Sequence, residues 1–151
     1  MIFMNAVLHY FLNSEAEVRG VEFLAPRELD AGFDLPSLDS ITVEPGAFAL
    51  LRTGVHLAVP EGWVGLVRDR SSVALKGGMT VAGVIDASYR GEVKIAFYNF
   101  SKAPLTFEVG DRIAQIIILP HLPGTQSTKI ELLEGLGETM RGAGGFGSTG
   151  T

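Results

Sequence analysis

The chain contains no cysteine and few histidines, which narrows the catalytic and metal-binding chemistry open to it. Without cysteine among its 151 residues, it can hold no disulfide, no thiolate zinc site and no cysteine nucleophile. Its three histidines, His9, His56 and His121, lie too far apart in the sequence to indicate a metal cluster. Disulfide-stapled folds and thiolate chemistry are therefore excluded.

Long apolar runs and basic clusters are missing as well. No stretch reaches the roughly 18 apolar residues that a membrane helix needs. The apolar N-terminus, residues 1–12, lacks the cationic region that begins a signal peptide, since the first basic residue is Arg19. The net charge is −5, and no basic run could follow a nucleic-acid backbone. We expect a soluble, cytoplasmic protein that binds neither nucleic acid nor membranes.

What the chain does contain is ample apolar material. Hydrophobic residues make up 46% of it and charged residues 19%, which is enough to build the core of one domain of ordinary size. The low charged fraction leaves apolar surface to be covered. We therefore expect a single folded domain that assembles into an oligomer.

Glycine and proline divide the sequence into short segments. There are 19 glycines and 7 prolines, and apolar residues seldom recur at helical spacing, which predicts an all-β sandwich or barrel. Residues 55–59 and 63–67 flank a Pro60-Glu-Gly62 turn and predict a hairpin. Residues 93–100 and 105–109 alternate as strands do, residues 113–119 predict a strand buried on both faces, and residues 1–12 predict a further strand.

Residues 71–76 are the one segment that predicts a short helix. Asp69 or Arg70 stands near its N-cap, and Gly77-Gly78 ends it. Free N–H groups at its start, beside Arg70, Ser71 and Ser72, could bind an anion. Simple capping of the helix explains the same residues equally well.

The C-terminal residues 141–151 are rich in glycine, serine and threonine and cannot pack a core of their own. We therefore divide the chain into a folded domain, residues 1–140, and a tail, residues 141–151. The tail is either a flexible linker or a mobile lid over a phosphate chain. In the second interpretation Arg141 neutralises charge and Phe146 stacks on a planar ligand or packs on a neighbouring subunit.

Two carboxylates and one amide are candidate site residues. Asp86 follows an apolar strand, where it could act as a general base or open a turn. Asp34 is likewise either a turn former or a contact to a metal-bound water. Gln115 lies inside an apolar strand, so its side-chain amide must find a hydrogen-bond partner.

Five segments, taken together, resemble the five motifs of the trimeric deoxyuridine triphosphatase (dUTPase) family in order and spacing. The resemblance runs from about residue 30 to the end, and the third and fifth motifs are long and specific. Residues 1–29 carry no family motif, and we expect an edge strand and an approach loop there. The five segments are Ala31-Gly-Phe-Asp-Leu35, Arg70-Ser-Ser72, Gly83-Val-Ile-Asp-Ala-Ser-Tyr-Arg-Gly91, Gly110-Asp-Arg-Ile-Ala-Gln115 and Arg141-Gly-Ala-Gly-Gly-Phe-Gly-Ser-Thr-Gly150.

The resemblance implies both an architecture and a reaction. The architecture is a distorted jelly-roll-like β-barrel in a homotrimer, with active sites at subunit contacts and each tail closing over a site formed by its neighbours. The reaction is hydrolysis of dUTP to dUMP and pyrophosphate by water attack on the α-phosphorus. Mg²⁺ is expected as cofactor, held mainly by triphosphate oxygens and waters. Such an enzyme supplies thymidylate precursor and keeps uracil out of DNA.

The resemblance also assigns roles to residues. Asp86 becomes the base for the attacking water, Tyr89 lies beneath the deoxyribose, and main-chain groups of residues 80–94, Gly83 among them, bind uracil. Thr80 stands where the family often has Asn. The remaining implied ligands are Lys94 for substrate, Arg70, Ser71, Ser72 and Gln115 for phosphates, Phe146 for the uracil ring, Arg141, Gly147, Ser148 and Thr149 for the terminal phosphates, and Asp34 for the metal through water.

Two other functions are compatible with parts of this pattern. A dCTP deaminase of the same fold would need a catalytic Glu where this chain has Ala96, and a methyl group cannot shuttle protons. A nucleotide-binding regulatory trimer would hold the nucleotide without releasing pyrophosphate. A turnover assay distinguishes that binder from the hydrolase.

Overall fold

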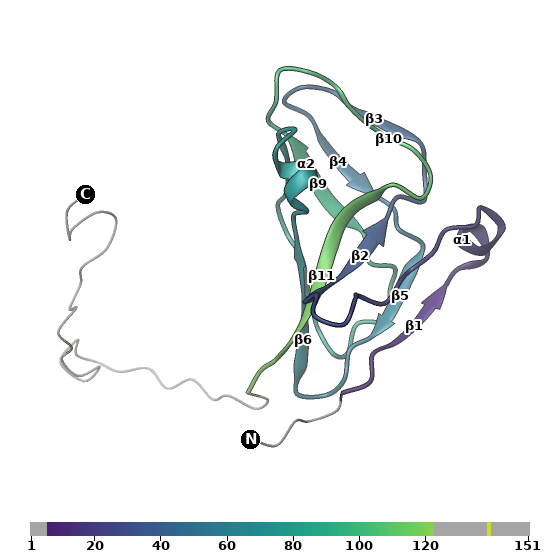
Figure 1. The fold of residues 1–151 in the computed structure, drawn as a ribbon, viewed down its shortest axis with the longest axis vertical. Coiled ribbons are helices and arrows are strands. Elements are labelled where there is room, and N and C mark those ends of the chain that lie inside the picture. The colour runs from purple at the N-terminus through teal and green to yellow at the C-terminus, as the bar shows by residue number, and fades with distance from the viewer. Residues whose placement is uncertain (1–5, 123–138, 140–151) are drawn as a thin grey trace.

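The computed structural model describes residues 6–122 and residue 139, and this part of the chain is built mainly of short strands (Figure 1). Two short helices interrupt them, α1 (Ser14–Val18) and α2 (Ser71–Ala74). The strands are β1 (His9–Leu12), β2 (Gly32–Pro36), β3 (Ile41–Val43), β4 (Phe48–Leu51), β5 (Val55–Ala58), β6 (Trp63–Arg68), β7 (Gly78–Thr80), β8 (Val84–Ile85), β9 (Ile95–Asn99), β10 (Leu105–Phe107) and β11 (Arg112–Pro120).

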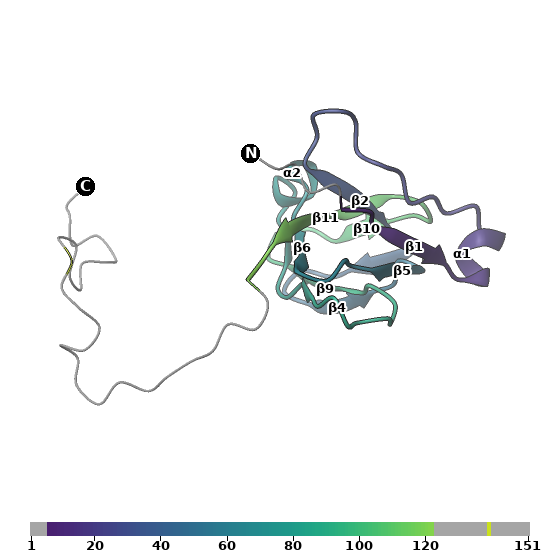
Figure 2. The same cartoon turned by 90° about the horizontal axis from the view of Figure 1, so that it is seen from below.

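The described strands form four antiparallel sheets rather than one closed barrel. Their orders are β2-β11-β6-β8, β4-β9-β7, β1-β5 and β10-β3. Figure 2 shows the β11–β6 sheet lying over the β4–β9 sheet. Apolar side chains from both sheets, such as Phe97, Leu51 and Ile116, meet in a single core cluster between them. The expected all-β class is confirmed, with sheets packed face to face around one core.

The alternating pattern of residues 93–100 is confirmed by burial. Val93, Ile95, Phe97 and Asn99 are all buried, whereas Lys94 is exposed. Asn99 is satisfied inside the core, because its amide donates to the carbonyl oxygens of Val43 and Ala103. The strand at 105–109 is present as the shorter β10.

The strand predicted at residues 113–119 is present as β11, but only its first half is buried on both faces. Ile113, Ala114 and Ile116 are buried, whereas Leu119 is exposed. The pairing with β2 stops at Ile117, and beyond that residue β11 pairs with β6 alone. The apolar run, interrupted only by Gln115, could not reveal where the neighbouring strand ends.

The hairpin predicted around Pro60-Glu-Gly62 is wrong, although both of its strands exist. β5 pairs with β1, whereas β6 pairs with β11 and β8. A turn closed by a hydrogen bond from Trp63 N–H to the Pro60 carbonyl leads the chain from one sheet to the other. Local turn chemistry was predicted correctly, and the partner of each strand was not.

The N-terminal region holds a second helix that the sequence pattern did not predict. Asn13 caps α1 by accepting a hydrogen bond from Ala16 N–H at 2.9 Å. Ala16 is buried against Leu38 and Val21, and a Cβ on Gly54 would lie 2.6 Å from its methyl group. Five residues are too few to display a helical apolar period. The strand expected at residues 1–12 covers only β1, and residues 1–5 lie outside the described part.

The helix expected at residues 71–76 is present as the shorter α2. Arg70 occupies the N-cap position without a side-chain cap bond, since a guanidinium group cannot accept a hydrogen bond from the helix N–H groups. The neighbouring Asp69 carboxylate accepts the Thr80 N–H at 2.6 Å. The helix ends at Ala74 with Leu75 as its C-cap, earlier than the expected stop at Gly77-Gly78, and Gly77, with φ of 90°, lies in the turn that follows. Neither described helix is long and apolar enough to cross a lipid bilayer.

Candidate active site

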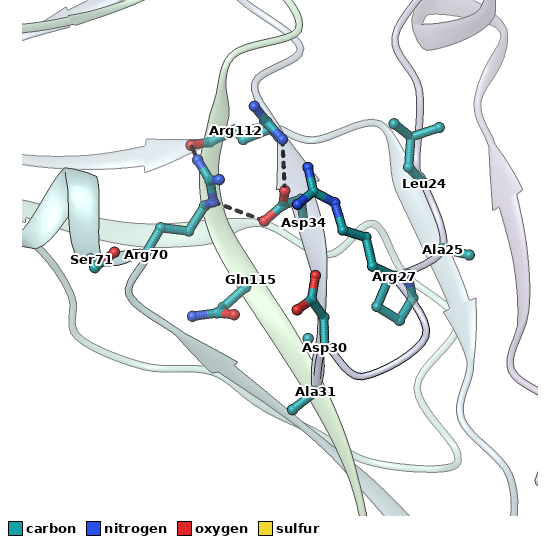
Figure 3. Close-up of a pocket in the computed structure, with 12 residues that line it drawn as sticks. Leu24, Ala25, Arg27, Asp30, Ala31, Asp34, Arg70, Ser71, Arg112 and Gln115 are labelled. Carbon is teal, nitrogen blue, oxygen red and sulfur yellow. Dashed lines mark hydrogen bonds and ion pairs between the residues drawn. The ribbon is translucent and has the colours of Figure 1, made fainter.

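The first, second and fourth motif segments meet in one polar pocket of about 630 Å³ (Figure 3). Asp34 on β2, Arg70 and Ser71 at the start of α2, and Gln115 on β11 all line it. The loop before β2 forms the opposite wall and contributes Arg27. Segments far apart in the sequence therefore come together here because β11 lies beside β2, and β6 leads directly into α2.

Asp34 lies between two arginines in this pocket. Its carboxylate is 2.8 Å from Arg70 Nε and 3.3 Å from an Arg112 guanidinium nitrogen. Arg70 also donates to the Arg112 carbonyl at 3.1 Å. The single carboxylate orients both guanidinium groups but neutralises only one of their two charges. The remaining positive charge suits an anionic ligand.

Gln115 has the hydrogen-bond partner that its position required. Its Nε2 donates to the Asp69 carbonyl at 2.9 Å, which leaves the amide oxygen on the side of β2. A Cβ on Gly32 would lie 2.5 Å from that oxygen, so glycine at this position leaves room for the amide. The expected pairing is confirmed and ties β11 to the residue just before Arg70.

The two serines of the second motif face different hollows. Ser71 lines the pocket of Figure 3, whereas Ser72 lines a neighbouring groove of about 360 Å³. Arg70 and Arg112 border both hollows, and Lys76 borders the second. Both serines are exposed. The start of α2 thus divides a cationic surface into two compartments.

The third motif lies in a separate pocket of about 330 Å³. Asp86, Tyr89 and Lys94 line it together with Leu50 and Glu92. The Asp86 carbonyl accepts the Tyr89 N–H at 3.0 Å, which closes a turn. The Tyr89 hydroxyl donates to the Glu92 carbonyl at 2.9 Å. Asp86 is exposed to solvent.

Gly83 holds this segment against β6. Its φ is 145°, its carbonyl accepts the Val67 N–H at 2.8 Å, and a Cβ would lie 2.5 Å from the Val67 side chain. Glycine is therefore required both by its backbone angle and by the close approach of the two strands.

The two pockets share no lining residue. Segment 80–86 runs antiparallel to β6, with Thr80 bonded to Asp69 at one end and Ile85 paired with Gly65 at the other. Asp86 consequently lies toward the far end of β6 from Arg70. Within residues 6–122, Asp86 therefore does not share a cavity with Arg70, Ser71 and Gln115.

The comparisons with known proteins agree with the five motif segments. The dUTPase family model matches residues 23–150. The chain belongs to the dUTPase family. It is 45% identical over 125 residues to the deoxyuridine 5'-triphosphate nucleotidohydrolase of Solibacter usitatus, covering 80% of this chain and 81% of the relative. It is 44% identical over 130 residues to the enzyme of that name from Corynebacterium diphtheriae, covering 80% of each chain.

Solved dUTPase structures share the fold. The dUTPase of Staphylococcus bacteriophage 80alpha, solved with dUpNHpp, matches with a TM-score of 0.82 at 28% identity, over 96% of this chain and 99% of that one. A point mutant of the dUTPase from phage phi11 of S. aureus matches with a TM-score of 0.71 at 26% identity, over 85% of this chain and 99% of that one. That structure is described as revealing the coordination of a structural Mg(II) ion.

Some family residues lie outside the described part, and two arginines of the pocket were missed by the sequence analysis. The residues outside the described part belong to the fifth motif and are Arg141, Phe146, Gly147, Ser148 and Thr149. The expected boundary between the folded domain and the tail, at residues 140 and 141, also lies outside it. Arg112 stood within the fourth motif, where only Gln115 was singled out. Arg27 carried no local signal, because it belongs to no motif and reaches the pocket only through the path of its loop.

Proposed function

We propose that this chain is a dUTP diphosphatase that hydrolyses dUTP to dUMP and pyrophosphate. Membership of the dUTPase family and relatives named deoxyuridine 5'-triphosphate nucleotidohydrolase support this activity. The observation that carries it is the pair of pockets, one cationic with Arg70 and Gln115, the other holding Asp86 and Tyr89. The reaction supplies dUMP for thymidylate synthesis, keeps uracil out of DNA and belongs to the cytoplasm.

Asp86 is the proposed general base. Its carboxylate makes no hydrogen bond or ion pair with the residues that the structure describes, so its oxygens are available to a water molecule. The carboxylate orients that water and takes its proton as the oxygen bonds to the α-phosphorus. The bond from the α-phosphorus to the bridging oxygen breaks, and pyrophosphate leaves.

Selection of the nucleoside is assigned to the same segment. Tyr89 is anchored by its hydroxyl, so its ring can lie beneath the deoxyribose where a ribose 2′-hydroxyl would clash. Main-chain groups around Gly83 are proposed to bind the uracil edge, where a fixed donor opposes the amino group of cytosine. Lys94 lines the pocket as a further substrate contact. Ala96 of β9 supplies no proton-transfer group, which argues against deamination of dCTP.

Among the described residues, no group of three or more His, Cys, Asp or Glu side chains is placed to hold a metal ion. A divalent metal at this pocket would therefore take most of its ligands from the substrate and from water. Asp34 is bonded to two arginines, so it is assigned only a contact through water. We propose Mg²⁺ as cofactor, where it neutralises triphosphate charge. Arg70, Ser71, Ser72 and Gln115 then bind the phosphate oxygens directly.

We propose a homotrimer with active sites shared between subunits. The separation of the two pockets supports this proposal, because a second copy would bring its Asp86 opposite the pocket of Arg70, Ser71 and Gln115, which we call the phosphate pocket. The outer face of the β4-β9-β7 sheet offers apolar surface for such contacts, since Phe48, Leu50 and Met79 are exposed there. Residues 1–140 form the catalytic domain, and residues 141–151 are proposed to close over a neighbouring site. Neither nucleic acid nor a membrane is part of this proposal.

The direct test is turnover of each deoxynucleoside triphosphate and of UTP by the purified full-length chain. Release of pyrophosphate from dUTP, with little from dCTP, dTTP or UTP, supports the proposal. Ammonia release from dCTP would indicate the deaminase instead. Tight dUTP binding without pyrophosphate release would indicate a binding protein.

An additional regulatory role has one specific observation in its favour. The 80alpha phage dUTPase, similar over 99% of its length, is described as controlling transfer of virulence genes by a G protein-like mechanism. By analogy, this chain would bind a protein partner only when nucleotide is present. Pull-downs with this chain as bait, with and without dUpNHpp, test that role separately from catalysis.

A further inference from the structure

One wall of the phosphate pocket comes from the loop before β2, and its residues 24–27 belong to none of the five motifs (Figure 3). Phe23 is buried just before this loop and stacks on Phe33 of β2 with ring centroids 5.5 Å apart. The Asp30 N–H donates to the Arg27 carbonyl at 2.9 Å and closes a turn. The loop is therefore anchored on both sides of the position that carries Arg27.

Arg27 points its side chain into the pocket. In Figure 3 the guanidinium group lies beside Asp34 and on the same side of the hollow as Arg112. Arg27 is exposed, and its side chain has no ion pair or hydrogen bond with any residue in the described ranges. Arg27 is thus a cation that faces the pocket without a partner among residues 6–122.

The other two arginines of the pocket are in a different situation. Arg70 and Arg112 share the carboxylate of Asp34, at 2.8 and 3.3 Å. Asp30 also lines the pocket, so three guanidinium groups face two carboxylates. The lining therefore keeps a surplus of positive charge, and Arg27 is the one of these three arginines whose guanidinium group no described carboxylate holds.

We infer that Arg27 binds the β- and γ-phosphates of the substrate, and this inference rests on the proposed function. Asp86, the proposed base for the water that attacks the α-phosphorus, lines a different pocket. The α-phosphate must therefore lie where a neighbouring subunit presents Asp86, and the remaining phosphates extend into the pocket that Arg27 borders. A guanidinium fork matches two phosphate oxygens in a charge-assisted pair.

The experiment compares wild type with three substitutions of Arg27. Wild type, Arg27→Ala, Arg27→Lys and Arg27→Gln are titrated with dUpNHpp, dUMP and pyrophosphate, and dUTP turnover is measured in parallel. Lys102→Ala is the matched control, because Lys102 is exposed and borders neither the phosphate pocket, the groove beside it nor the pocket of Asp86. Melting temperatures confirm that each variant is folded.

Arg27→Ala is expected to weaken dUpNHpp binding and raise KM for dUTP by about tenfold, as loss of a charge-assisted pair does. Pyrophosphate affinity falls similarly, and dUMP affinity is unchanged because dUMP lacks the contacted phosphates. Turnover at saturation changes little, since the contact exists in both the ground state and the transition state. Arg27→Lys retains part of the affinity and Arg27→Gln does not.

Unchanged dUpNHpp affinity in Arg27→Ala, or an equal loss of dUMP affinity, would overturn the inference. An equal loss of dUpNHpp affinity in Lys102→Ala would overturn it as well, because the loss would then result from the lower net positive charge and not from a contact made by Arg27. Failure of the proposed function looks different, because wild-type protein would then release no pyrophosphate from dUTP.

Discussion

The carboxylate of Asp69 accepts a hydrogen bond from the main-chain N–H of Thr80 at 2.6 Å. The carbonyl of the same Asp69 accepts the Gln115 amide at 2.9 Å. One residue therefore joins the phosphate pocket to the start of segment 80–86, which ends in the proposed base. Substitution of Asp69 by alanine removes the hydrogen bond to Thr80. The hydrogen bond to Gln115 remains, because it uses the main-chain carbonyl of residue 69.

The bond between Asp69 and Thr80 is expected to support catalysis by positioning segment 80–86. Asp69→Ala leaves the Thr80 N–H without its acceptor, which typically costs about 1–3 kcal/mol for a group shielded from water. We expect kcat to fall and discrimination against dCTP to weaken, with dUpNHpp still bound through the phosphate pocket. Asp69→Asn keeps an acceptor oxygen and should restore both properties. A melting temperature that drops equally in both variants, with kinetics unchanged, would contradict the positioning role.

Asp86→Asn is expected to keep the fold and nucleotide binding while removing most turnover. The amide cannot take the proton of the attacking water, and loss of a general base typically slows reactions by about 10²–10⁴-fold. Single-turnover pyrophosphate release measures the effect. Glu61→Gln, a change of an exposed carboxylate in the turn before β6, is the control. Activity within a few-fold of wild type would remove Asp86 from the base role.

Mixing two inactive variants tests whether the pockets of different subunits cooperate. Arg70→Ala damages the phosphate pocket and Asp86→Asn damages the other pocket of the same chain. If each active site takes one pocket from each of two subunits, trimers reassembled from both variants contain some intact sites. We expect activity to reappear after co-refolding, with a maximum near equal proportions. A mixture as inactive as its components, despite verified hetero-oligomers, would mean that one subunit supplies both pockets.

The motif segments and most strands could be predicted from the sequence, but not which strands pair. The alternation of residues 93–100 reports burial directly, and Gln115 required a polar partner wherever its strand lay. The partners of β5 and β6 depend on contacts with β1 and β11, which lie far away in the sequence. The motifs assign Arg70, Ser71 and Gln115 to one site, and the structure places all three in one pocket. Arg27 enters that pocket through a loop whose start is fixed by stacking of Phe23 on Phe33, which no local pattern reveals.

The ion pair between Glu15 and Arg52 is expected to stabilise the docking of α1 in a pH-dependent way. The hydrogen bond from Arg52 lowers the pKa of Glu15 below its ordinary value of 4.5. A lowered pKa in the folded state means that the contribution is present above pH 4.5 and is lost as the pH falls through the folded-state pKa. Glu15→Gln should melt slightly below wild type at neutral pH, since exposed pairs contribute little. The difference should vanish in acid; a gap that persists there would show that the charge is not its cause.

Residues 141–151 lie outside the described part, and the linker and lid interpretations predict opposite results when this tail is deleted. The composition of this tail does not provide a core of its own, so the melting temperature and the proposed trimer should persist in either case. A lid contributes a guanidinium, hydroxyls and the ring of Phe146, which act as charge develops on the phosphates. Activity should then collapse on truncation.

Phe146→Ala should be milder than the truncation, because base stacking is worth about 1–3 kcal/mol. A Phe146→Trp reporter in a Trp63→Phe background follows closure directly. Normal dUTP hydrolysis by the truncated chain, with no emission change on adding dUpNHpp to an active reporter, would leave only the linker.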